Sequence, residues 1–165
     1  MTDTELQQKR LIAAAIDAGI AIALAIAIAI FGAIVGHVIA PMLGGVVGVL
    51  GQVVLLAYIL LRDIIDGNRS LGKKAQEIKV VTTSGAPLTA MDSIKRNAIL
   101  AIGSVLGLIW AMAGLIPFLA CLLMPLMFLG SLVSLAMVII EIVKIIQDPA
   151  GVRFGDQFAS TRVTR

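Results

Sequence analysis

Residues 11–40 read LIAAAIDAGIAIALAIAIAIFGAIVGHVIA, an apolar stretch in which Asp17 is the only formally charged side chain. A helix needs about 20 apolar residues to cross a bilayer, so this stretch is long enough to do so. Alanine and isoleucine alternate over residues 21–30, but both are apolar, whereas a transmembrane barrel strand needs a polar residue at every second position. The stretch therefore predicts a membrane-spanning α-helix.

The rest of the chain continues this pattern. Hydrophobic residues make up 59% of the sequence and charged residues only 14%, which excludes an ordinary soluble domain. Two long blocks, residues 18–61 and 97–140, contain no Asp, Glu, Lys or Arg, and the turn-forming segments PMLGG (41–45) and GLIP (114–117) divide them. The sequence predicts an all-α integral membrane protein whose four transmembrane helices form two hairpins, with spans near 11–40, 45–62, 97–115 and 118–146.

Basic residues indicate how these helices cross the membrane. All thirteen Lys and Arg residues lie in three segments, 1–10, 62–96 and 141–165. The positive-inside rule places such segments in the cytoplasm, so we expect a multi-pass protein of the cell membrane (inner or plasma membrane) with both termini cytoplasmic. We expect a single membrane domain that consists of N-terminal segment 1–10, hairpin 11–62, cytoplasmic loop 63–96, hairpin 97–146 and cytoplasmic tail 147–165. The net charge of +3 follows from this topology. No nucleic-acid binding is expected, because the basic loop lacks interleaved aromatic residues.

Asp17 is the first candidate for a functional residue, because a carboxylate inside a membrane span is expensive and tends to face protein or water. It lies on a stripe of alanines spaced four residues apart, which includes Ala13 and Ala21. Since small residues let helices pack closely, we expect Asp17 to face a neighbouring helix. Glu141 is a second carboxylate of this kind. With the helical rise, Asp17 lies about 10 Å from Arg10 and Glu141 about 9 Å from the end of its helix, so we expect both at a similar depth.

Several polar residues are predicted to gather around these two carboxylates at the cytoplasmic end of the helices: Arg10, Arg62, Asp63, Arg96, Asn97 and Lys144. Two interpretations stay open. In the structural one, an arginine neutralises Asp17 and the network locks the four helices together. In the functional one, Asp17 and Glu141 bind a proton or a small cation (Na⁺ or K⁺), because paired carboxylates in a low dielectric hold a proton tightly or coordinate a hard cation. Glu141 can instead pair with Lys144, three residues further along the helix.

The cytoplasmic loop is expected to contact lipid rather than a nucleotide. Residues 67–73 have the glycine spacing of a P-loop, but Lys74 replaces the required Ser or Thr and no strand precedes the motif. We expect a short amphipathic helix, followed by two strands that turn through residues 84–87. The basic side chains Arg69, Lys73 and Lys74 are candidates for contact with anionic lipid headgroups.

The sequence does not predict an enzyme, because no nucleophile–base pair, metal cluster or cofactor motif is visible in it. Cys121 is the single cysteine, so neither a disulfide within the chain nor a multi-cysteine metal site can form. We therefore expect no catalytic residue, no metal and no cofactor.

Seven short motifs occur in order along nearly the whole chain. They are RLIA (10–13) with Asp17, RD (62–63), GNRSLGKK (67–74), KVV (79–81), GAP (85–87), SIKRN (93–97) and GDQFASTRV (155–163). Together they resemble the RDD family of small prokaryotic integral membrane proteins, named for one arginine and two aspartates. The resemblance implies that Arg10, Asp17 and Asp156 are the signature triad. The chain departs from the family at residues 75–78 (AQEI), which are more polar than the usual Gly-Leu stretch.

Two functions follow from these expectations. The first is a transport-type role, in which a proton or monovalent cation is exchanged or sensed through Asp17. The resemblance supports it, because some members of the family are proposed to be monovalent cation/proton antiporters. The alternative is a non-catalytic membrane scaffold or accessory subunit, with Asp156 paired to Arg10, Arg62 or Arg96 as a structural clamp. Because four helices leave little room for a pathway, we expect a homo-oligomer or a partner membrane protein.

Overall fold

The structure, a computed structural model, describes residues 3–148 and 151–164. Its helices are α1 (Asp3–Val38), α2 (Pro41–Leu61), the 3₁₀ helix η1 (Arg62–Ile64), α3 (Leu71–Ala75), α4 (Ala90–Ala113), α5 (Pro117–Gln147) and α6 (Phe154–Phe158), and its strands are β1 (Lys79–Thr82) and β2 (Thr161–Thr164). By length and composition, α1, α2, α4 and α5 can each cross a membrane. These helices confirm that the chain is mostly helical and has four helices long and apolar enough to cross a membrane, which we call the spanning helices.

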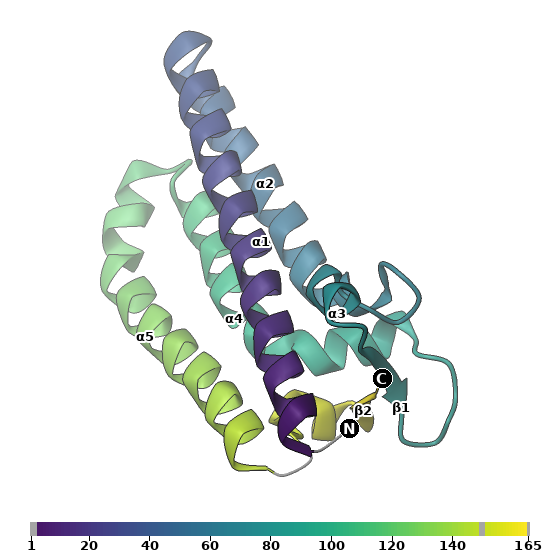
Figure 1. Cartoon of the computed structure of the whole chain (residues 1–165). Coiled ribbons are helices and arrows are strands. Elements are labelled where there is room, and N and C mark those ends of the chain that lie inside the picture. Colours follow the sequence, from purple (N-terminus) through teal and green to yellow (C-terminus); the bar gives the residue numbers. More distant parts are fainter. Residues whose placement is uncertain (1–2, 149–150, 165) are drawn as a thin grey trace.

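The four spanning helices pack in the order α1, α2, α4, α5, and α1 makes little contact with α5. Figure 1 shows the short elements gathered at one end of these helices, which we call the charged end. The opposite end, which we call the apolar end, carries the reversals between α1 and α2 and between α4 and α5. The beginning of α1 and strand β2 both lie at the charged end (Figure 1), so the two ends of the described chain meet there.

Both reversals differ in position from the predicted ones, because their prolines belong to the helices that follow. Pro41 and Pro117 are the first residues of α2 and α5, a position that suits proline because its missing N–H is not needed there. Residues 42–45 are helical as a result. Gly44 brings α2 against α1, since a Cβ at this position would lie 2.7 Å from the carbonyl oxygen of Gly32. Small residues thus allow close packing of helices at the apolar end.

Two spanning helices begin earlier than predicted, because the predicted starts followed the limits of the apolar stretches. α1 begins at Asp3, inside the predicted N-terminal segment. α4 begins at Ala90 instead of residue 97, and a capping box between Thr89 and Asp92 fixes this start. The basic side chains at the end of the predicted loop therefore project from a helix.

The two strands pair with each other and not across the predicted turn. β1 and β2 are antiparallel, with Val80 opposite Val163, so the prediction of two strands around residues 84–87 is wrong. The residues that follow this turn form the capping box and first turn of α4 and are not free to form a strand. Val80 and Val163 pack with Ala13 and Ile78 in a small hydrophobic core. This core fixes the tail beside α1.

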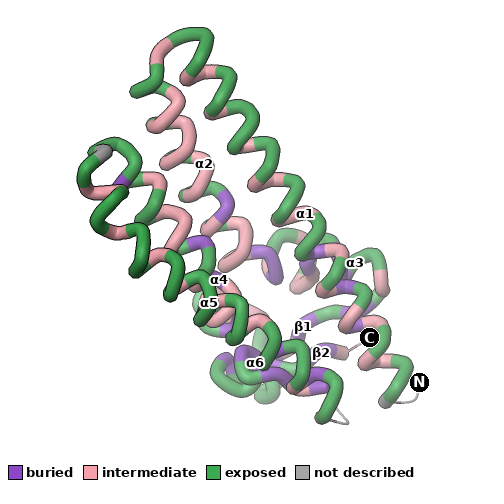
Figure 2. Tube along the Cα trace, turned by 90° about the vertical axis from the view of Figure 1, so that its left-hand side faces the viewer, coloured by how far each residue is buried: buried purple, intermediate pink, exposed green. Residues whose placement is uncertain are grey.

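Burial differs along the length of the helices. Figure 2 shows buried residues concentrated at the charged end, whereas α1 and α5 are exposed along most of their length. Their exposed side chains are large and apolar, and include Ile22, Phe31 and Leu132. Such surfaces suit contact with lipid, which is as apolar as these side chains.

Candidate functional site

Nine charged side chains of the described residues are buried at the charged end, and we call this set the charge cluster. Its cations are Arg10, Arg62, Lys73, Arg96 and Arg153, and its carboxylates are Asp17, Asp63, Glu141 and Asp156. They come from α1, η1, α3, α4, α5 and the segment that includes α6. Because the removal of an ion from water costs several kcal/mol, each of these groups needs partners. The contacts within the charge cluster therefore indicate its role.

Asp156 is the centre of the charge cluster. Its carboxylate accepts a hydrogen bond from Arg10 of α1, and it lies 2.9 Å from Nη2 of Arg96 of α4 and 3.1 Å from Nε of Arg153. Burial raises the pKa of Asp156, but the three guanidinium groups outweigh burial and hold the pKa well below its usual range. α6 also touches the backbone of α4, because a Cβ on Gly155 would overlap the carbonyl oxygen of Arg96. One carboxylate thus joins α1, α4 and the tail.

Asp63 is a second centre of the charge cluster, on η1. One of its oxygens accepts a hydrogen bond from the ammonium of Lys73. The other lies 3.1 Å from Nε of Arg96 and accepts a hydrogen bond from Nδ2 of Asn97 at 3.0 Å. Arg96 therefore bridges Asp63 and Asp156. Since η1 directly continues α2, this centre attaches α2 and α3 to α4.

Arg62, next to Asp63, has no carboxylate partner. Its Nη2 donates a hydrogen bond to Oδ1 of Asn97 at 3.1 Å, and Arg153 donates to the same oxygen at 3.3 Å. None of the ion pairs within the described residues includes Arg62, and its Nε has no hydrogen-bond partner there. Arg62 is only 8% exposed, and the carboxylates that act on its buried charge, Asp63 and Asp17, do so from beyond ion-pair distance.

The hydrogen-bond partners of Asp17 are neutral donors. It accepts hydrogen bonds from the hydroxyl of Ser70 and, at 2.8 Å, from the backbone N–H of Gly72. No ion pair in the part of the chain that the structure describes includes Asp17. Glycine is required at position 72, because a Cβ there would overlap the carbonyl oxygen of Ala13. The structural interpretation of the sequence predicts that an arginine neutralises Asp17. In the structure its partners lie at the start of α3 instead, so Asp17 holds α3 against α1.

Glu141, the second predicted ion-binding carboxylate, has partners of its own. It accepts a hydrogen bond from the N–H of Gly155 at 3.2 Å, and its Oε2 lies 3.8 Å from Nε of Arg153. Lys144, considered as an alternative partner, instead places its ammonium 4.9 Å from the centre of the Phe154 ring. The structure therefore gives the two predicted ion-binding carboxylates separate partners.

The prediction that Lys73 contacts lipid headgroups is wrong, because its side chain is buried against Asp63. Burial, together with the arginines of the charge cluster, outweighs Asp63 and lowers the pKa of Lys73 to about 7. The side chain of Lys74, in contrast, is 60% exposed and pairs with Asp66 at 2.9 Å. Arg69 is half-buried. Lys74 and Arg69 therefore remain candidates for headgroup contact.

Sequence reasoning missed two members of the site, Arg153 and Ser70. Burial lowers the pKa of Arg153, but Asp156 and other carboxylates of the charge cluster outweigh burial, so the pKa is raised. Ser70 is the N-cap of α3, a position that serine favours, so a helix-start signal could have found it. Arg153 has no such signal, because the tail sequence does not distinguish it from the exposed Arg162.

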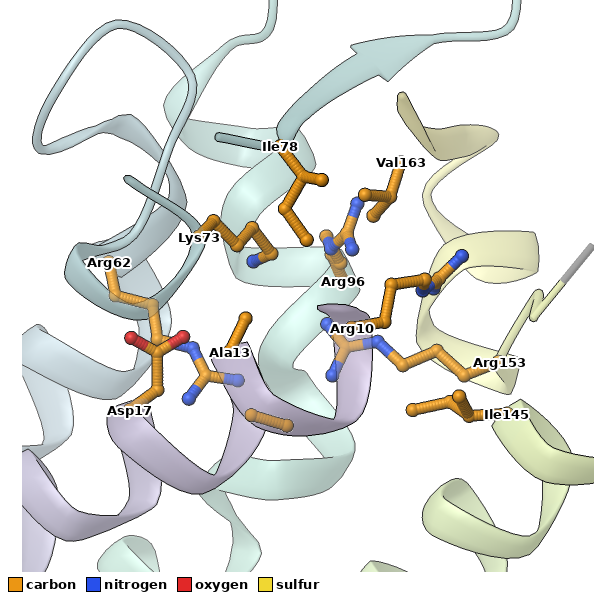
Figure 3. A pocket seen from close by; sticks show the side chains of 11 residues that line it. Arg10, Ala13, Asp17, Arg62, Lys73, Ile78, Arg96, Ile145, Arg153 and Val163 are labelled. Atoms are coloured by element: carbon orange, nitrogen blue, oxygen red, sulfur yellow. The ribbon is translucent and has the colours of Figure 1, made fainter. Parts of the chain in front are cut away.

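A small cavity of about 30 Å³ lies inside the charge cluster (Figure 3). All five cations of the charge cluster line it, but only one of the four carboxylates, Asp17. Its other walls are apolar and include Ala13, Ile78 and Val163. A cavity of this size has room for about one or two water molecules.

Within the described residues, no group of three or more His, Cys, Asp or Glu is placed to hold a metal ion.

A family model described as the RDD family matches residues 7–160, from α1 to the residue before β2. The match includes Arg10, Asp17 and Asp156, the implied signature triad. The structure brings Arg10 and Asp156 into direct contact, whereas Asp17 contacts the start of α3. No curated protein and no solved structure matches the chain.

Proposed function

The chain belongs to the RDD family, and from this premise we propose that it is a multi-pass membrane scaffold or accessory subunit, in which the charge cluster clamps the short elements to the spanning helices. We place the charged end in the cytoplasm, in accordance with the positive-inside rule. The observation that carries this proposal is the convergence of Arg10, Arg96 and Arg153 on Asp156. Each arginine comes from a different part of the chain, so one carboxylate holds these parts together.

The distribution of charge supports a structural role over cation exchange. Three of the four carboxylates in the charge cluster form ion pairs, and the fourth, Asp17, shares its cavity with five cations. These cations would repel a sodium or potassium ion, because like charges interact strongly in a low dielectric. Both Asp17 oxygens also accept hydrogen bonds already. A monovalent cation therefore has no favourable field there, and Asp17 already uses part of its capacity to act as a ligand.

Hydrogen exchange tests the clamp directly. In an Asp156→Asn variant, we expect faster amide exchange in α6 and β2, because the tail loses its attachment, while the spanning helices stay protected. Unchanged exchange in α6 and β2 would contradict the clamp. An Asp66→Asn variant serves as the matched control, because Asp66 pairs only with the exposed Lys74 in the described structure.

Proteoliposomes test the scaffold proposal against transport. We expect wild-type protein to show no flux of Na⁺, K⁺ or H⁺ above that of protein-free liposomes when each gradient is imposed in turn. A wild-type flux that disappears in a folded, monodisperse Asp17→Asn variant would contradict the scaffold proposal.

A transport-type role based on protons is the second candidate. The observation in its favour is that Asp17 has no ion pair among the described residues although it lines the cavity. If Asp17 carries a proton across, Asp17→Glu should keep a pH-driven flux that Asp17→Asn loses, because only the carboxyl can bind the proton. A pH-sensitive dye inside proteoliposomes measures this difference.

A further inference from the structure

The charge cluster carries one more positive than negative charge. Among the described residues it contains five cationic side chains and four carboxylates. Arg62 is the cation without an ion pair in this part of the chain. A buried charge without an ion-pair partner is unfavourable. The nine buried side chains are therefore short of one negative charge, and Arg62 is the cation left without an ion pair; Asp148, outside the charge cluster, acts on Arg10.

Arg62 and the other cations surround the cavity. Nε of Arg62 has no hydrogen-bond partner in the described structure although the residue is 8% exposed. Figure 3 shows the side chains of Arg62, Lys73 and Arg96 around the same space. Asp17 is the one carboxylate in the lining, and both of its oxygens are engaged by donors from the start of α3. The cavity thus offers cationic donors and lacks a matching acceptor.

We propose that this cavity binds one monovalent inorganic anion of about the size of chloride. The anion neutralises the excess charge and gives Arg62 an acceptor. With room for about one or two water molecules, the cavity suits a monatomic anion and excludes sulfate, phosphate and organic carboxylates. Its apolar walls, which include Ala13 and Ile78, favour an ion that gives up water easily. The proposal does not depend on the scaffold role, because it concerns only the interior of the charge cluster.

The charge cluster can also lose its excess positive charge without an anion, because Lys73 can release its proton. Its pKa of about 7, lowered by burial, places this release near neutral pH. The charged groups that face Lys73 are Asp63 and Arg62 of η1, Arg96 of α4 and Arg153 before α6, with Arg10 and Asp17 of α1 around the same cavity. Anion binding and loss of the Lys73 proton therefore compete. We expect the affinity for the anion to fall as the pH rises through 7.

Chloride binding by the full-length protein in detergent tests the proposal. The protein is prepared in gluconate, a monovalent anion too large for the cavity. Equilibrium dialysis with radioactive chloride measures binding at pH 6 and pH 9. We expect one chloride per chain at pH 6 and an affinity at least about tenfold weaker at pH 9, because the protonated form of Lys73 is then scarce. Bromide should compete with chloride, and sulfate should not.

Thermal unfolding supplies a second readout. When chloride replaces gluconate at constant ionic strength, we expect the Tm to rise with a saturable dependence on chloride, because an ion that binds only the folded state stabilises it. The rise should be larger at pH 6 than at pH 9. A Tm that is the same in both anions at pH 6 would overturn the proposal.

Two variants test whether chloride binds in the cavity. Arg62→Gln removes the excess charge and should abolish both chloride binding and the chloride-dependent rise in Tm. Lys74→Gln is the matched control, because Lys74 is adjacent to Lys73 in sequence but its side chain is 60% exposed. This control should bind chloride as the wild-type protein does.

Each outcome decides the proposal. A wild-type protein that binds no chloride at pH 6 would overturn it and indicate water in the cavity. Binding that persists in a folded Arg62→Gln variant would also overturn it, because the ion would then bind elsewhere. If Arg62→Gln does not fold, the wild-type protein decides alone: binding that weakens at pH 9 supports the proposal, and binding independent of pH overturns it.

Discussion

The two ends of the same four helices are held together in opposite ways. At the charged end, buried ion pairs connect segments far apart in the sequence, such as those of Arg10 and Asp156. At the apolar end, α1 and α2 meet through glycines, as at Gly32 and Gly44. Most residues on the outer surfaces of the helices there are exposed (Figure 2), and many of them are large and apolar.

This difference follows from the surroundings of each end. Lipid gives no hydrophobic drive for helix association, so the closeness of fit decides how helices pack at the apolar end. Buried charges are costly without partners, so the charged end tolerates few alternative arrangements. We infer that the charged end selects the arrangement of the helices and that the apolar end contributes less. Four measurements test this ranking.

The largest effect is expected for Asp156→Asn. This change leaves Arg10, Arg96 and Arg153 without their shared carboxylate, and the loss of one partner of a buried ion pair costs about 3–5 kcal/mol. Denaturant unfolding in mixed micelles measures the loss, with Asp66→Asn as the control on the exposed surface. Equal losses in the two variants would contradict the ranking of the two ends.

The next effect is the dependence of stability on pH. The pKa of Lys73 is lowered to about 7 in the folded protein, so the unfolded chain binds more protons between pH 7 and the ordinary pKa of lysine. Stability should therefore rise by a few kcal/mol over this range, and Lys73→Met should flatten the rise.

On the acid side of the same dependence of stability on pH, a carboxylate whose pKa is lowered replaces the lysine as the titrating group. The pKa of Asp156 is held below its usual range in the folded protein, so its contribution is present above that range and is lost as the pH falls through it. Thermal unfolding in chloride-free gluconate from pH 3 to pH 10 records both limbs. A profile that is flat on both sides would show that the charged end contributes little.

Glycine substitutions probe the apolar end. A Cβ at Gly44 would lie 2.7 Å from backbone atoms of α1, whereas none of the neighbouring helix atoms lies within 4 Å of a Cβ at Gly48. Gly44→Ala should cost about 1–3 kcal/mol through overpacking, and Gly48→Ala should cost nothing. The same unfolding assay compares them, and a loss at Gly44 greater than that of Asp156→Asn would reverse the ranking.

The smallest effect is expected at the edge of the charged end. The ammonium of Lys144 lies 4.9 Å from the centre of the Phe154 ring, and a cation–π contact at an exposed site contributes about 0.5–1 kcal/mol. Phe154→Leu should lose this amount and Phe158→Leu, at an exposed ring of α6, should not. Equal losses would assign the effect to apolar contact instead.

The spanning helices could be predicted from the sequence because a membrane span depends on length and the absence of charge, which are local properties. The pairing of β1 with β2 could not, because it joins Val80 to Val163 across most of the membrane domain. The start of α4 was mispredicted for a different reason. Its capping box of Thr89 and Asp92 lies outside the apolar stretch that predicts the span.

Two adjacent lysines in the site also show what the sequence alone cannot predict. Lys73 is buried against Asp63, while Lys74 is exposed, and the sequence alone makes them equivalent. Their difference depends on how the short helix α3 is turned, which Asp17 determines by its hydrogen bonds to Ser70 and Gly72 of the loop. The sequence therefore predicts Asp17 as a residue of the site but not its partner Ser70.

The contact between Arg10 and Asp156 also has a consequence for biosynthesis. The ribosome makes Arg10, in α1, well before Asp156, which it makes only after all four spanning helices. Arg10 and Arg96 therefore enter the membrane region before their shared carboxylate exists. The contacts of Asp156 can form only after the tail has left the ribosome, whereas those of Asp63 and Asp17 can form earlier. Translation that stalls before residue 156 therefore leaves a bundle without its Asp156 clamp.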